Sequence, residues 1–145
     1  MELLAHPLRR AALPFVFAGA LGLGIWLWLQ LGDFSLAHCP PELVWYGGAS
    51  GDMKCRWPLA VYLAKDMVGA AITSALPVLL CAAMAPARKA TTARIAAIGI
   101  CALALLYLLG GSHDLRPASL LTGVGLAFAL SPWLAALLVA RAARP

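Results

Sequence analysis

Cys39 and Cys55 are the two residues most able to form a covalent cross-link in this chain. The segment between them contains two adjacent prolines and three glycines, so the chain can turn back on itself. A disulfide that closes a loop of this size stabilises a fold by about 3 kcal/mol in the chain-entropy model. The spacing is not C-x-x-C, which gives little support to a thioredoxin-like redox centre. We therefore predict a structural disulfide between the two cysteines.

A metal site is the competing use of these cysteines. Together, His38, Cys39, Cys55 and His113 would offer two sulfur and two nitrogen ligands. Zinc and copper accept this mixture of ligands. The spacing matches no familiar metal motif, however, and oxidation would remove both thiolates. We predict no metal and no other cofactor.

His113 and Asp114 lie in the most polar short segment, residues 111–117. A histidine titrates near neutral pH, so beside a carboxylate it could transfer a proton. No nucleophile stands in a recognisable context near them, and we assign no catalytic residue. A solvated turn is the simpler interpretation of this candidate outer-loop site.

Lys65 and Asp66 are the only charged residues whose position allows them to enter the hydrocarbon of a membrane. Ionisable groups there are costly and usually functional. With Thr73 and Ser74, and with Arg116 as a partner for Asp66, they form a candidate polar or transport site. Adjacent residues on a helix do not face each other, so we expect no mutual pair between Lys65 and Asp66. Anchoring of both at the membrane interface is the alternative, and the sequence favours it.

Four long apolar runs must position these residues, at about 11–31, 67–87, 95–111 and 118–140. A helix needs roughly 20 residues to cross a hydrocarbon core about 30 Å thick. The chain is 63% hydrophobic and only 12% charged, and its mean hydropathy is +0.87, which excludes an ordinary soluble domain.

These runs predict an all-α, polytopic membrane protein, with four transmembrane helices in a small bundle and a periplasmic loop between helices 1 and 2. We expect a single domain, 1–145, with spans at about 11–31, 58–87, 95–111 and 118–140 and an outer loop at 32–57.

The basic residues indicate an orientation. Seven of them fall on the side of both termini and the 88–94 turn, against four on the opposite side. Basic residues near span ends stay in the cytoplasm, so both termini are expected there, in a multi-pass protein of the cell inner membrane. The net charge of +5 does not indicate nucleic-acid binding, because the basic residues form no continuous patch.

Small residues recur four positions apart in three of the runs, as in Ala18/Gly22 and Ala20/Gly24. This spacing lets helix backbones approach closely. Packing within the bundle explains it, and a dedicated oligomerisation face is the alternative.

The functional prediction is a small non-catalytic accessory or interaction subunit of a membrane complex. Its partners would be the lipid bilayer and other membrane subunits or copies of itself, with no nucleic acid. A small oligomeric transporter or channel, with a polar site near Lys65 and Asp66, is the alternative. A periplasm-facing thiol or redox enzyme that uses Cys39 and Cys55 is a weaker alternative.

Overall fold

The computed structural model describes residues 2–47, 52–86, 88–110 and 118–143. Within these ranges the elements are α1 (Glu2–Ala37), η1 (Pro41–Leu43), β1 (Val44–Gly47), β2 (Asp52–Cys55), α2 (Leu59–Met84), α3 (Lys89–Gly110) and α4 (Ala118–Ala142). The described chain is mostly helical, as predicted. Each of its four α-helices is long and apolar enough to cross a membrane.

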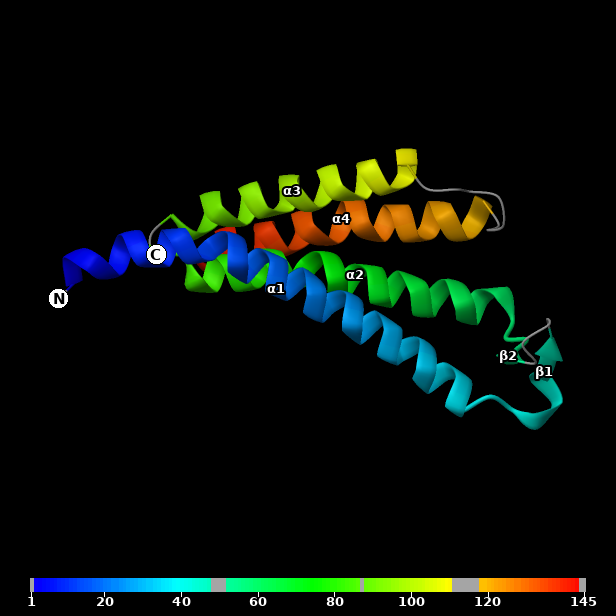
Figure 1. Ribbon diagram of the computed structural model, residues 1–145. Coiled ribbons are helices and arrows are strands. Elements are labelled where there is room, and N and C mark those ends of the chain that lie inside the picture. Colours follow the sequence, from blue (N-terminus) through cyan, green and yellow to red (C-terminus); the bar gives the residue numbers. More distant parts are fainter. Residues whose placement is uncertain (1, 48–51, 87, 111–117, 144–145) are drawn as a thin grey trace.

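The central helix is α2, because it packs against α1, α3 and α4. Helix α3 lies along α4, whereas α1 lies along α2 and diverges from it toward the two strands (Figure 1). The start of α1, the end of α4, the end of α2 and the start of α3 all lie at one end of the molecule (Figure 1). We call this the basic end, because Arg10, Arg88 and Arg141 lie there. The strands lie at the opposite end, which we call the hairpin end.

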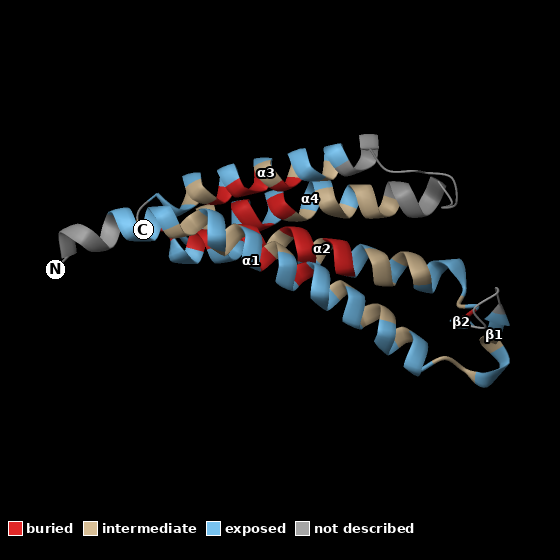
Figure 2. Cartoon of the chain, in the orientation of Figure 1, coloured by how far each residue is buried: buried red, intermediate tan, exposed pale blue. Residues whose placement is uncertain are grey.

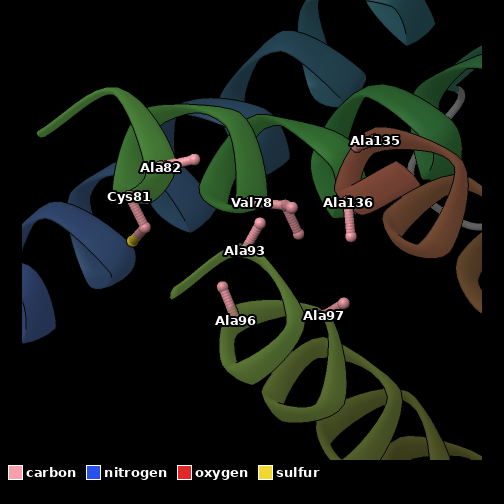
Figure 3. Close-up of a cluster of buried hydrophobic side chains, with 8 residues drawn as sticks. All are labelled: Val78, Cys81, Ala82, Ala93, Ala96, Ala97, Ala135 and Ala136. Carbon is pink, nitrogen blue, oxygen red and sulfur yellow. The ribbon is translucent and has the colours of Figure 1, made fainter. Parts of the chain in front are cut away.

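The core consists of small side chains from three helices. Val78 and Cys81 pack among buried alanines of α2, α3 and α4 (Figure 3), namely Ala82, Ala93, Ala96, Ala97, Ala135 and Ala136. In α3, Ala93 lies three and four positions before Ala96 and Ala97, so the three alanines share one side of the helix, and α4 contributes the adjacent pair Ala135 and Ala136. Helices in a membrane associate by such close packing, since lipid offers no hydrophobic drive between them. The buried residues lie mainly in the middle and toward the basic end (Figure 2).

Two prolines lie in helix interiors within this core. Pro77 of α2 and Pro132 of α4 are both fully buried. A proline cannot donate to the carbonyl four residues earlier, which is that of Thr73 in α2 and of Phe128 in α4. Both helices continue past their proline, so contacts with neighbouring helices must compensate for these carbonyls.

The segment expected to be an outer loop, 32–57, is more ordered than predicted. Its first part continues α1 as far as Ala37, where His38, Cys39 and the two prolines end the helix. A 3-10 turn follows, and then β1 and β2 pair antiparallel with Val44 opposite Cys55. Valine, tryptophan and tyrosine in β1 favour a strand. The 3-10 turn and the two strands are only three or four residues long, which is too short for a hydrophobic pattern to predict them.

Helices α1, α3 and α4 extend beyond the expected spans, whereas α2, at Leu59–Met84, is slightly shorter than the expected 58–87. The structure begins α3 at Lys89 rather than at 95, and α1 begins before residue 11. Hydropathy marks the part of a helix that lipid can surround, whereas the helix itself continues into its charged ends. Residues 59–66 belong to one continuous α2, which begins close to the start of the span expected from residue 58.

Candidate functional site

The candidate polar site centres on a contact between α1 and α2. The indole Nε1 of Trp28 donates a hydrogen bond to the Oδ1 of Asp66 at 3.1 Å. The Nζ of Lys65 lies 3.6 Å from the same carboxylate oxygen, and both charged side chains are about four-fifths buried, with 21% and 18% exposed. The prediction that Lys65 and Asp66 form no mutual pair is therefore wrong. A lysine side chain is long enough to fold back toward a carboxylate on the next residue, although the two side chains leave the helix in different directions.

Trp28 also joins a third helix to this contact. Its ring lies over Gly69 of α2, where any Cβ would overlap the indole. The ring centroid is 5.8 Å from that of Phe128 in α4, at an interplanar angle of 50°. One side chain of α1 thus packs against both α2 and α4. Gly69 is required here because only a residue without a side chain leaves room for the ring.

One turn further along α2, Thr73 faces Gly24 of α1. A Cβ at Gly24 would lie 2.6 Å from the Cα of Thr73 and 3.3 Å from its carbonyl oxygen. This carbonyl is the one that Pro77 leaves without a helical donor. Gly24 therefore covers a free backbone acceptor, and its Cα–H can make the weak contact to oxygen found between closely packed helices. The Thr73 hydroxyl donates to the carbonyl of Gly69 at 2.8 Å.

The neighbouring residue, Ser74, faces α4 instead. Its hydroxyl donates to the carbonyl of Ala70 at 2.7 Å and lies 2.5 Å from the hydroxyl of Ser131. Either serine can be the donor in this bond between α2 and α4. Ser131 also lies within 3.2 Å of the Ala71 carbonyl. These bonds connect α2 and α4 inside the buried core.

The depth of these groups follows from helix rise. Ser131 lies ten residues before Arg141, or roughly 15 Å along α4, which is half of a hydrocarbon core. Asp66 lies eight residues before Ser74 in α2, or roughly 12 Å nearer the hairpin end. The serine pair thus falls near the middle of a membrane-sized layer, and Asp66 falls near its edge at the hairpin end.

The arrangement can hold helices together through polar contacts. Among the described side chains, no buried nitrogen or oxygen lacks a hydrogen-bond partner. Lys65 and Asp66 lie about two turns of α2 before Thr73 and Ser74, and these residues contact two different helices rather than one shared cavity. Arg116, His113 and Asp114 lie outside the described residues.

The disulfide predicted between Cys39 and Cys55 is present, with the two Cα atoms 5.9 Å apart. It ties the end of α1 to β2. Trp57 adds a second link, since its Nε1 donates to the carbonyl of Ser35 at 3.1 Å. The Tyr62 hydroxyl donates to the carbonyl of Cys55 and so joins the first turn of α2 to the hairpin. In the described part of the chain, His38 and the cysteines belong to no group of three or more metal-ligating side chains.

Sequence reasoning missed the roles of Trp28 and Ser131. Trp26 and Trp28 lie two residues apart on α1, but Trp26 is largely exposed, whereas Trp28 packs against α2 and α4. A serine one residue before a buried proline gave a weak indication for Ser131. Gly24, four residues earlier, could have indicated the role of Trp28. Residues four apart share a helix face, so a glycine packed against a neighbouring helix places Trp28 toward that helix as well.

No protein-family model, curated protein or solved structure matches this chain. The function must therefore be argued from the chain itself.

Proposed function

We propose that this chain is a non-catalytic subunit of the cell inner membrane that associates laterally with another membrane helix through α1. Its termini would lie in the cytoplasm and its disulfide-closed hairpin in the periplasm. The excess of basic residues at the basic end supports this orientation. The disulfide supports a periplasmic location for the hairpin, because disulfides form in an oxidising compartment.

The main observation behind the proposal is that one face of α1 carries small residues that no described helix contacts. We call it the glycine face of α1. Gly24 and Ala20 are buried against the other helices, but Ala18, Gly19 and Gly22 are exposed. A Cβ added at Gly19 or Gly22 would meet no atom within 4 Å. Ala18 and Gly22 therefore form a small-residue pair that no described helix covers. Such pairs let a second helix approach closely within a bilayer.

The position of α1 also supports association. Only 11% of its most apolar stretch is buried inside the structure, compared with 44% for α2. Phe15 and Trp26 flank the exposed small residues, and both side chains are more than half exposed. Large side chains beside a glycine groove can pack around a second helix, whereas α2 already has neighbours on three sides.

The transport alternative has less support. Its candidate hydroxyls, those of Thr73 and Ser74, donate to carbonyls of their own helix, and Ser74 also pairs with Ser131. Asp66 has two partners, Trp28 and Lys65. Groups paired in this way serve helix packing more readily than they serve a solvated pathway.

The test is Gly22→Leu, with Gly125→Leu as the matched control. Gly125 lies on α4, and a Cβ there also meets no atom within 4 Å. Self-association is measured by energy transfer between labelled copies in liposomes, and association with partners by crosslinking in cells. We expect Gly22→Leu to weaken association by about tenfold and Gly125→Leu to leave it unchanged. A parent chain that is monomeric and crosslinks to nothing would refute the proposal, as would equal association of both variants.

A further inference from the structure

A pocket of about 460 Å³ opens at the basic end, between α1 and the turn from α2 to α3. Its lining combines basic, hydroxyl and apolar side chains, namely Arg10, Leu13, Pro86, Arg88, Thr91 and Thr92. None of these residues belongs to the polar contacts around Trp28 or to the exposed glycine face of α1. The pocket therefore needs an explanation of its own.

The two arginines of the pocket, Arg10 and Arg88, make no ion pair with any side chain in the described part of the chain. The described ion pair, Lys65 with Asp66, lies far along α2. Lys89 follows Arg88 directly and adds a third positive charge. A pocket lined by two arginine side chains is complementary to an anion, and guanidinium groups bind phosphate oxygens in a bidentate manner.

The backbone at Arg88 indicates that the arginine side chain itself matters. Its φ is 52°, in the left-handed region that favours glycine. Its carbonyl accepts from the amides of Thr91 and Thr92, so Arg88 occupies the N-cap position of α3. Serine, threonine, aspartate or asparagine would cap the helix there, and an arginine side chain has no oxygen to do so. An unfavourable residue at such a position is consistent with a function of its side chain.

The apolar part of the lining identifies the anion's source. Leu13 lies one helical turn beyond Arg10, where the apolar run of α1 begins, and Pro86 also lines the pocket. A free phosphate would gain nothing from these two residues. A phospholipid would place its phosphate at the arginines and the start of its acyl chains on the apolar side, at the level of the membrane surface. We infer that this pocket binds the phosphate headgroup of an anionic phospholipid of the cytoplasmic leaflet.

The test measures phosphatidylglycerol retained by the purified full-length chain, using native mass spectrometry and titration in detergent micelles. The variants are Arg10→Gln and Arg88→Gly, and the control is Arg9→Gln, an exposed neighbour that does not line the pocket. Arg88→Gly removes the charge yet suits the positive φ, so the turn should fold at least as well as in the parent. Helix content and melting temperature in phosphatidylcholine check this directly.

We expect each pocket variant to weaken phosphatidylglycerol binding by about fivefold, and Arg9→Gln to leave it near the parent value. Inorganic phosphate should not displace the lipid. The inference is overturned if folded Arg88→Gly binds the lipid as the parent does, or if the loss is equal in Arg9→Gln. Displacement of the lipid by inorganic phosphate would identify a soluble-anion site and overturn the lipid assignment.

Discussion

The indole of Trp28 reaches from α1 to the carboxylate of Asp66 in α2, with 3.1 Å between Nε1 and Oδ1. The same ring covers Gly69 and contacts Phe128 of α4. The Trp28 side chain therefore holds α1 in its position against α2 and α4, near the hairpin end of the apolar layer. Asp66, the most conspicuous charged residue of the sequence, has a partner that the sequence did not indicate.

Replacing Trp28 separates its packing from its hydrogen bond. Trp28→Ala empties the space over Gly69 and should lower the free energy of unfolding by about 3–5 kcal/mol. Trp28→Phe keeps a ring against Phe128 but removes the donor to Asp66, so the loss should be about 1 kcal/mol. Both are measured by titrating sodium dodecyl sulfate into the folded protein in mild detergent. Equal losses in the two variants would show that the ring does not pack as described.

Gly24 and Gly22 lie on the same helix and should respond oppositely to alanine. A Cβ at Gly24 would overlap the backbone of Thr73, so Gly24→Ala must push α1 from α2 and cost about 1–3 kcal/mol of stability. A Cβ at Gly22 meets nothing within 4 Å, and alanine favours helix, so Gly22→Ala should raise stability by up to about 1 kcal/mol. The same unfolding titration compares them. If Gly22→Ala proved the more damaging change, the assigned rotation of α1 would be wrong.

The hydrogen bond between Ser74 and Ser131 should appear as a coupling energy. Ser74→Ala, Ser131→Ala and the double variant form a thermodynamic cycle across α2 and α4. Interhelical hydrogen bonds in membranes average about 0.6 kcal/mol in such cycles, and a coupling of that size is expected here. Strictly additive losses would mean that the two hydroxyls do not interact.

The disulfide should stabilise the hairpin end. Replacing both Cys39 and Cys55 with serine opens a loop with a sequence separation of 16, which corresponds to about 3 kcal/mol of loop-closure entropy. The expected result is faster cleavage by added protease between Cys39 and Cys55, while α3 and α4 remain protected. Unchanged protection of this segment would show that Trp57 and Tyr62 hold it without the disulfide.

The helices could be predicted from the sequence because each apolar run is long enough to dominate any local preference. The disulfide could also be predicted from the sequence. Cys81 and Cys101 lie within apolar runs, so only Cys39 and Cys55 remain to pair outside them. Contacts between helices could not be predicted from the sequence, because they depend on how each helix is rotated about its axis. Trp26 and Trp28 are two residues apart, yet one is mostly exposed and the other is inserted between helices.

The pocket at Arg10 and Arg88 illustrates the same limit. In the sequence these residues belong to the basic groups that indicate orientation, and nothing separates Arg10 from its neighbour Arg9. The chain places Arg10 beside Arg88 because α1 packs against α2 near the turn that leads into α3. Tertiary structure thus separates Arg10, which lines the pocket, from Arg9, which does not.

The proposed topology places both ends of the chain on the cytoplasmic side of the membrane. It is tested most directly by labelling single cysteines in intact cells. Ala143→Cys lies just beyond α4 and Met53→Cys lies in β2, and both positions are exposed. Cys81 and Cys101 are replaced by alanine in both variants. A membrane-impermeant maleimide should label Met53→Cys in intact cells and Ala143→Cys only after the membrane is opened. Labelling of Ala143→Cys in intact cells would contradict the proposed topology.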